Sequence, residues 1–313
     1  MSAIVTITFS PCIDKSTSIK KLLPDKKLQC AEPKLEAGGG GINVARAIKK
    51  LGGDAVAIFP SGGYTGKYFN HLLEKENIST IIIESQNETR ENVIVLDEFE
   101  NAQYRFGMPA TQLLAEEWQQ CLKALQEIKD VSYIIASGSL PPGVPLNIYA
   151  QLSVIAKEKN AKFIVDASGE ALKEAWDEGV YLLKPNLGEL CFLAGKANLQ
   201  PFEIETVAKE MLDKDKCEAM VVSMGAEGAM LVTTDLTKII KAPSVTRKST
   251  VGAGDSMLAG IVHFLSQGRN IVEAATYGVA CGTAATMNEG TELCRLKDVK
   301  DIYRKLSEKI KAE

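Results

Sequence analysis

Histidine is scarce in this 313-residue chain, which has only His71 and His263. A histidine-based metal site or a Ser-His-Asp triad therefore has little to draw on. The seven cysteines are an odd number, are widely spaced and contain no CxxC pair, so neither a disulfide framework nor a zinc site is favoured. The chemistry of the protein is expected to depend on carboxylates, backbone amides and cations.

Long apolar runs and a strong excess of one charge are also missing. No apolar stretch approaches the ~18 residues of a membrane span, and the N-terminus has no basic region followed by a long apolar one. The net charge is −4, from 36 basic and 40 acidic residues, which gives no general attraction to nucleic acid or to an anionic membrane. We expect a cytoplasmic protein with no nucleic-acid or membrane partner.

What the chain does have is a regular alternation of two patterns. Apolar runs typical of strands occur at residues 4–9, 55–59, 80–83, 133–136, 163–165, 181–183 and 220–223. Helical patterns lie between them or end the chain, at residues 42–51, 68–76, 146–159, 170–176, 256–265, 271–287 and 296–310. Such alternation predicts an α/β fold with a mainly parallel sheet covered by helices on both faces.

Two stretches interrupt this rhythm, approximately within residues 11–35 and 88–108. They have the character of extended hairpins and are short to fold alone, so we predict that they form one small accessory sheet. Such a sheet could serve as a lid or as a dimer surface. Since no internal repeat or linker is evident, residues 1–313 are predicted to form a single domain.

Two glycine-rich segments each precede an apolar helical pattern. The first, AGGGGINVAR (residues 37–46), matches neither the P-loop nor the GxGxxG dinucleotide pattern. The second, STVGAGDS (residues 249–256), adds a carboxylate, Asp255. Backbone amides at such helix starts can bind a phosphoryl group, and Asp255 would then be placed to accept a proton from an attacking hydroxyl. The alternatives are turns and an N-cap aspartate.

Other polar residues have two interpretations each. In KPNLGE (residues 184–189), Asn186 and Glu189 fit either a capping box or a magnesium site. Arg90 and Arg105 on the accessory strands could bind a phosphate, but either could be a solvated surface charge. Asp166, at the end of its strand, is more readily explained as a structural cap than as a catalyst.

AGGGGINVARA, KPNLGE and STVGAGDSM, in this order, resemble the motifs of the PfkB (ribokinase-like) sugar kinase family, and the resemblance covers essentially the whole chain. SPCIDKS, QYRFGMP and SGSLPPGV are similar to segments of its 6-phosphofructokinase group. The resemblance implies a ribokinase-like three-layer α/β sandwich with a small β-sheet lid. It also implies MgATP as cosubstrate and a homodimer formed through the lid.

The resemblance implies roles for individual residues. Asp255 would be the general base, and the anion hole would comprise Gly252, Ala253 and Gly254. Substrate-binding positions would be Asp14, Gly39, Gly40, Asn43, Arg90, Arg105, Ser139 and Asp255. ATP-binding positions would be Lys184, Asn186, Ser223, Gly225, Gly228, Arg247, Lys248, Ser249, Thr250, Val279 and Thr283. Glu189 would be linked to Mg²⁺, and a K⁺ loop would comprise Ser249, Val251, Ala285, Asn288, Gly290 and Glu292.

The implied reaction is ATP-dependent phosphorylation of D-fructose 6-phosphate at O1 to fructose 1,6-bisphosphate, a step of glycolysis. Tagatose-6-phosphate kinase and 1-phosphofructokinase activities remain alternatives, because those family members share the same motifs. A non-catalytic sugar-phosphate or nucleotide sensor is an alternative of another class. Asp255 and Glu189 argue against it, because a protein that only binds needs neither a base nor a metal carboxylate. Arg90 and Arg105 favour a sugar that already carries a phosphate.

Overall fold

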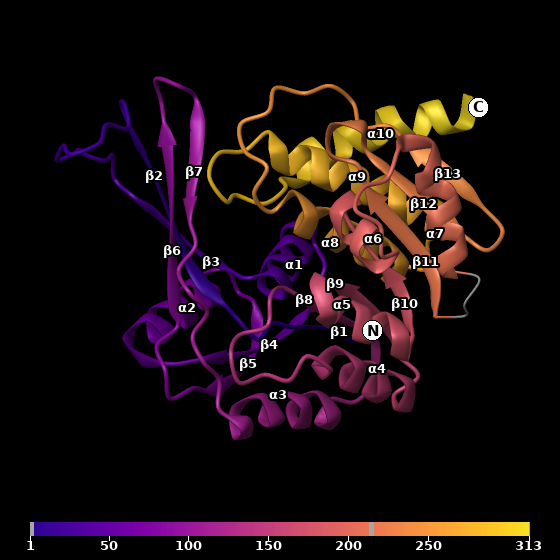
Figure 1. Cartoon of the computed structure of the whole chain (residues 1–313), viewed down its shortest axis with the longest axis horizontal. Coiled ribbons are helices and arrows are strands. Elements are labelled where there is room, and N and C mark those ends of the chain that lie inside the picture. Colours follow the sequence, from indigo (N-terminus) through magenta and orange to yellow (C-terminus); the bar gives the residue numbers. More distant parts are fainter. Residues whose placement is uncertain (1–2, 213–215, 313) are drawn as a thin grey trace.

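The computed structural model describes residues 3–212 and 216–312, whose strands form a large sheet and a small one (Figure 1). The large sheet has nine strands in the order β13-β12-β11-β10-β9-β8-β1-β4-β5. They are β1 (Ala3–Ile7), β4 (Val56–Ser61), β5 (Ser79–Glu84), β8 (Val131–Ser137), β9 (Lys162–Asp166), β10 (Val180–Leu183), β11 (Cys217–Ser223), β12 (Ala229–Thr233) and β13 (Thr237–Ile240). All neighbours pair in parallel except β11 with β12 and β12 with β13.

Helices cover both faces of the large sheet and bury a separate apolar core on each. One core includes side chains of α1 (Gly40–Lys50), α2 (Gly63–Lys75), α8 (Ala253–Ser266), α9 (Ile271–Thr286) and α10 (Leu296–Ala312). The other includes side chains of α3 (Ala115–Glu127), α4 (Ile148–Glu158), α5 (Gly169–Glu178), α6 (Leu187–Leu193) and α7 (Ile204–Leu212). Successive residues of a strand face opposite cores, as Ile134 and Ile135 do. The predicted three-layer α/β arrangement is confirmed.

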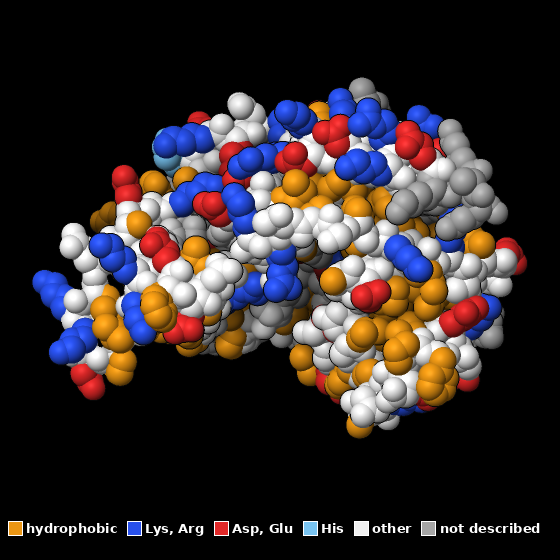
Figure 2. All heavy atoms as spheres, turned by 90° about the horizontal axis from the view of Figure 1, so that it is seen from above, with side chains coloured by type: hydrophobic (Ala, Val, Ile, Leu, Met, Phe, Trp, Pro, Cys, Tyr) orange, Lys and Arg blue, Asp and Glu red, His pale blue; other side chains and the backbone are white. Residues whose placement is uncertain are grey.

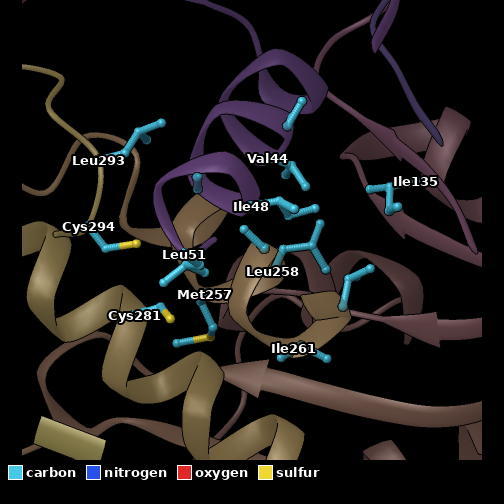
Figure 3. Close-up of a cluster of buried hydrophobic side chains, with 14 of the residues drawn as sticks. Val44, Ile48, Leu51, Ile135, Met257, Leu258, Ile261, Cys281, Leu293 and Cys294 are labelled. Carbon is cyan, nitrogen blue, oxygen red and sulfur yellow. The ribbon is translucent and has the colours of Figure 1, made fainter. Parts of the chain in front are cut away.

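Helices α1 and α8 pack against each other through apolar side chains (Figure 3). Val44 and Ile48 of α1 lie with Leu258 and Ile261 of α8 in one buried cluster, and none of the four is more than marginally exposed. Burying side chains of this size stabilises the interface by roughly 1.5–3 kcal/mol each. The packing therefore holds the start of α1 beside the start of α8, and both starts are glycine-rich.

The small sheet contains β3, β2, β6 and β7 in that order. Their bounds are β2 (Cys12–Ile19), β3 (Lys34–Gly38), β6 (Arg90–Asp97) and β7 (Ala102–Phe106). The hairpin β6–β7 and the antiparallel pair β2–β3 are joined by parallel pairing of β2 with β6. Strand β3 extends past the approximate limit at residue 35 as far as Gly38, which pairs with Cys12. The first glycine segment thus begins inside the small sheet.

Some elements of the large domain were not predicted from the sequence. Helix α3 and the edge hairpin β12–β13 are new, and α2 begins at Gly63 rather than at residue 68. Between residues 3 and 312, with residues 213–215 set aside, no helix combines the length and the apolar character needed to cross a membrane.

Candidate functional site

The predicted site residues of the large domain gather at one edge of the main sheet. The parallel strands β8, β9, β10 and β11 all end there, at Ser137, Asp166, Leu183 and Ser223. In open α/β sheets the ligand site lies outside these carboxyl ends. The small sheet stands beside this edge, and a hollow separates the two parts (Figures 1 and 2).

Asp255 lies in the first turn of α8, directly after a turn that requires glycine. Gly252, the residue before the helix, has a φ of 72°, in the left-handed region where other side chains are strained. Asn43, in the first turn of α1, donates a hydrogen bond from Nδ2 to Asp255 Oδ2 at 2.9 Å. The two glycine segments, whose pairing was not predicted from the sequence, are therefore joined by a direct contact between their helices.

The pKa of the Asp255 carboxyl is raised to about 7. Burial is the main cause and the negative charge of Asp166 adds to it, while the Asn43 hydrogen bond and Lys184 act in the opposite direction. A carboxyl with this pKa exchanges its proton near neutral pH, which is the range in which a general base is most effective. An N-cap role is ruled out at this position, because Gly252 is the N-cap and Asp255 lies inside the helix.

Lys184 brings a buried positive charge to the same place. Its side chain is only 5% exposed, and Nζ lies 3.1 Å from Asp166 Oδ2. Burial tends to lower the pKa of this ammonium, but Asp166, followed by Asp255 and Glu189, raises it overall. A Cβ added to Gly254 would lie 3.4 Å from Lys184 Nζ. The glycine turn (residues 252–254) thus combines helix-start amides with a neighbouring ammonium, which suits it to bind an anion.

Asp166 has a larger part in this site than the sequence indicated. It was interpreted as a structural cap, yet it pairs with Lys184 and raises the pKa of Asp255. The available signal was its position at a strand end, where α/β sheets bind ligands. The partner could not be inferred, because Lys184 follows the neighbouring strand β10.

The first glycine segment is shaped by close packing. Gly39 has a φ of 111°, and a Cβ on Gly40 would lie 2.2 Å from Ser137 Oγ. Larger residues would therefore push α1 away from the end of β8. These two glycines are needed to bring the helix start, with Asn43, against the edge of the main sheet.

Asp14 faces the site from β2 of the small sheet and is buried. Burial raises the pKa of its carboxyl, although Asn92 Nδ2 donates a hydrogen bond to Oδ1 at 3.0 Å. Cys12 Sγ lies 3.4 Å from the same oxygen. Asn92 was not predicted as a site residue. It is placed by the parallel pairing of β2 with β6, which sets Asp14 opposite Asn92 and which local sequence patterns do not reveal.

The two predicted phosphate-binding arginines contact different parts of the molecule. Arg90 donates hydrogen bonds from Nη1 to the carbonyl of Met108 at 3.0 Å and from Nη2 to that of Ser10 at 3.4 Å. Arg105 is exposed, and its Nη2 reaches Thr250 Oγ1 across the hollow at 2.9 Å. Ser139 is exposed as well, directly after Gly138, whose φ is 115°. Arg105 therefore connects the small sheet to the segment that precedes the glycine turn.

Asn186 and Glu189 form the capping box that the sequence allowed. Glu189 accepts a hydrogen bond from the backbone amide of Asn186 at 2.8 Å, and Asn186 Oδ1 accepts one from the amide of Glu189 at 2.9 Å. Burial nevertheless raises the pKa of the Glu189 carboxyl, and Asp166 adds to this effect. The box leaves one carboxylate oxygen of Glu189 available, so capping and metal binding are compatible here.

The remaining predicted nucleotide positions lie on three segments near the same sheet edge. Ser223 ends β11, and Gly225 and Gly228 follow it with φ values of 60° and 100°. Val279 and Thr283 are buried on α9. Arg247, Lys248 and Thr250 are exposed, and Lys248 pairs with Glu289 at 3.0 Å.

The predicted cation loop is tied to the glycine turn by short hydrogen bonds. Ser249 Oγ donates to the carbonyl of Gly290 at 2.6 Å and accepts from the amide of Val251 at 3.2 Å. Asn288 Nδ2 donates to the carbonyl of Leu293 at 2.9 Å. The remaining predicted positions are Ala285, which is buried at the end of α9, and Glu292, whose carboxylate is paired with Arg295 at 2.7 Å.

Comparisons with known proteins identify the family to which this chain is similar. The family described as pfkB family carbohydrate kinase matches residues 3–298. The ATP-dependent 6-phosphofructokinase isozyme 2 of Escherichia coli (strain K12) is 42% identical, over 98% of this chain and 100% of that protein.

Crystal structures of Escherichia coli phosphofructokinase-2 also match the fold. The complex with potassium has a TM-score of 0.94 at 42% identity, and the complex with fructose-6-phosphate has 0.93 at 40%. Each comparison covers 98% of this chain and 100% of the other. The chain therefore belongs to the pfkB family of carbohydrate kinases.

Proposed function

We propose that this protein is an ATP-dependent 6-phosphofructokinase, which transfers the γ-phosphoryl group of MgATP to O1 of D-fructose 6-phosphate. The observation that carries the proposal is the carboxyl of Asp255, with a pKa of about 7, in the first turn after a glycine turn flanked by Lys184. The 42% identical relative and the fructose-6-phosphate complex support this choice of substrate.

In the proposed reaction, Asp255 accepts the proton of the O1 hydroxyl as O1 attacks the γ-phosphorus. The new bond joins O1 to phosphorus, the bond between phosphorus and the β,γ-bridging oxygen breaks, and ADP leaves with the electron pair. Asn43 would hold the Asp255 carboxylate in its orientation through the 2.9 Å hydrogen bond. The amides of residues 252–254 and the Lys184 ammonium would stabilise charge on the phosphoryl oxygens.

Glu189 is the side chain proposed to be linked to Mg²⁺. Its carboxyl has a pKa raised by burial and by Asp166, so its negative charge is not fully balanced by the side chains around it. A divalent cation would supply that balance, and carboxylate oxygens are ligands that Mg²⁺ prefers. When bound, the ion would neutralise charge on the nucleotide phosphates. A K⁺ ion is proposed between two segments that are in contact, since the Ser249 hydroxyl donates to the carbonyl of Gly290. The proposed positions are Ser249, Val251, Ala285, Asn288, Gly290 and Glu292.

The small sheet is proposed to act as a lid and as a dimer surface of the single domain formed by residues 1–313. Asp14 and Arg90, near the starts of β2 and β6, would bind the sugar phosphate, while Arg105, which already reaches Thr250, would close over it. Exclusion of water by closure would suppress ATP hydrolysis. Phe99, 66% exposed in the turn between β6 and β7, and Phe106, 47% exposed at the end of β7, support pairing with a second copy.

The proposal is tested by coupled turnover with MgATP on fructose 6-phosphate, tagatose 6-phosphate, fructose 1-phosphate, fructose, ribose and adenosine. Fructose 6-phosphate is expected to give the highest kcat/KM. A higher kcat/KM for tagatose 6-phosphate or fructose 1-phosphate would mean that this sugar phosphate is the substrate, and the proposed mechanism would still apply. No turnover on any of them would favour the sensor alternative.

A further inference from the structure

The loop of residues 288–293 lies between the small sheet and the glycine turn, and it contacts both. On one side, Thr291 Oγ1 donates a hydrogen bond to Glu36 Oε2 of β3 at 2.8 Å. On the other side, Leu293 packs so closely that a Cβ added to Gly252 would lie 2.8 Å from its Cδ2. The loop therefore forms a physical connection between β3 and the first residue of the turn.

Glu36 and Thr291 meet in a buried place. The exposed fractions are 7% for Glu36 and 3% for Thr291. Glu36 also pairs with Lys34 Nζ at 3.2 Å and, through Oε1, with Arg46 Nη2 at 3.4 Å. A buried carboxylate is retained only when it is paired and hydrogen-bonded. Oε2 therefore accepts the Thr291 hydroxyl while it also lies 3.2 Å from Lys34 Nζ, and Oε1 faces Arg46.

Arg46 is fixed independently of this contact. It lies on α1 and is 2% exposed, and its Nε and Nη2 bind the two carboxylate oxygens of Glu76 at 2.8 and 2.6 Å. Its guanidinium thus keeps a bidentate partner when Glu36 is neutralised. A substitution at Glu36 can therefore remove the contact with Thr291 without leaving a buried arginine unpaired.

On the basis of the proposed function, we infer that Glu36 is a positioning residue for phosphoryl transfer, acting through Thr291 on the glycine turn. Thr291 holds the loop toward β3, and the backbone of Thr291 lies beside Gly252, since its carbonyl oxygen would be 3.9 Å from a Cβ there. Loss of the hydroxyl lets the loop and Leu293 relax toward the turn. A displacement of catalytic amides by about 1 Å can cost on the order of 10²-fold in rate.

The test compares Thr291→Val with Thr291→Ser and combines Thr291→Val with Glu36→Met. Valine keeps the shape and removes the hydroxyl, while serine keeps the hydroxyl. We expect Thr291→Val to lower kcat by roughly tenfold while the KM for the sugar phosphate stays within about twofold, the pattern of an interaction made mainly in the transition state. Thr291→Ser should remain close to wild type. Glu36→Met, which has no carboxylate or amide oxygen to accept the hydroxyl, should add little to Thr291→Val, because both remove the same hydrogen bond and Lys34 and Arg46 keep Glu292 and Glu76 as partners.

Three further readouts separate positioning from a loss of stability or of the base. Melting temperature gives the folded fraction, which should remain complete at the assay temperature. The midpoint of the acid limb of kcat/KM should stay at its wild-type pH, because Asp255 keeps its own surroundings. Wild-type turnover on the substrate panel is measured first, so failure of the proposed function appears in the wild type and failure of this inference appears only in the ratio of variant to wild type.

Several results would overturn the inference. They are a kcat for Thr291→Val within about twofold of wild type, an equal loss in Thr291→Ser, and additive effects of Glu36→Met and Thr291→Val. An activity loss that follows only the unfolded fraction would also overturn it.

Discussion

Charged groups of the candidate site differ in their exposure between the main body, which is the large sheet with its helices, and strand β7 of the small sheet. Asp255 and Lys184, on the main body, are withdrawn from solvent beside fixed partners, and the pKa of each is shifted upward. Arg105, on the small sheet, is exposed and shares its guanidinium between Gln103 and Thr250. Burial shifts the pKa of an ionisable group, whereas an exposed charged group mainly attracts and orients a ligand. For the proposed function, this difference favours proton transfer by Asp255 on the main body and capture of the substrate by Arg105 on the small sheet.

The largest effect is expected from removing the proposed base, Asp255, because this change should stop proton transfer on the main body while the small sheet still binds the substrate. Asp255→Asn is expected to lower kcat by roughly 10²–10⁴-fold or more, because the amide cannot accept the O1 proton while the sheet still binds the substrate. Steady-state kinetics with MgATP and fructose 6-phosphate measures the loss, and melting and ATP binding serve as controls for the fold. Near-normal turnover would remove Asp255 from the mechanism.

The matching change on the small sheet should alter binding. Arg105→Ala is expected to raise the KM for the sugar phosphate by about tenfold to a hundredfold, as expected for loss of a hydrogen bond to a charged group. The KM for ATP should change little. Arg105→Lys keeps the charge without the planar guanidinium, so its KM for the sugar phosphate should lie between those of wild type and Arg105→Ala. Equal increases in both KM values would instead indicate that Arg105 supports the folding of the sheet.

The pH dependence of kcat/KM should reflect the ionisation of Asp255, on the main body, and not of groups on the small sheet. Because Asp255 must be ionised to act as a base, kcat/KM should rise with pH and level off above about 7, the pKa of this carboxyl. Asn43→Ala removes a hydrogen bond that lowers this pKa, so the acid limb should move to higher pH. An unchanged limb in Asn43→Ala would mean that another group, such as Asp14, sets it.

The smallest expected effect concerns stability. The pKa of Asp255 is higher in the folded than in the unfolded chain, so its contribution to stability is present below pH 3.8 and is lost as pH rises through about 7. Asp255→Asn should therefore melt higher than wild type at pH 8, by roughly 2–4 °C for each kcal/mol gained. The difference should shrink toward pH 4. A lower melting temperature of Asp255→Asn than of wild type at pH 8 would show that neighbouring groups in the folded protein compensate the charge of the Asp255 carboxylate.

Local sequence patterns were sufficient for much of the large domain. Alternating strand and helix patterns predicted the mainly parallel sheet, and the two glycine segments predicted helix starts near a site. Helix α3 was missed although Trp118, Leu122 and Leu125 repeat with helical spacing. The periodic signal for this helix is therefore present in the sequence.

Other features depend on pairing between distant segments, which no local pattern encodes. The parallel pairing of β2 with β6 places Asn92 beside Asp14, and the neighbouring ends of β9 and β10 place Lys184 beside Asp166. The upward shift of the Asp255 pKa arises from burial and from Asp166, so it also follows from the tertiary fold. The sequence therefore predicted residue types at the site better than their partners.

The junction between β3 and α1 has a further consequence. The strand ends at Gly38 and the helix begins at Gly40, so a single residue separates the small sheet from the helix that carries Asn43. One inserted residue at this point would change the phase of α1 by about 100° and turn Asn43 away from Asp255. An insertion between residues 20 and 33, outside the strands, would leave that phase intact. The number of residues between β3 and α1 thus sets the direction in which Asn43 points. We therefore expect insertions to be tolerated least at this junction.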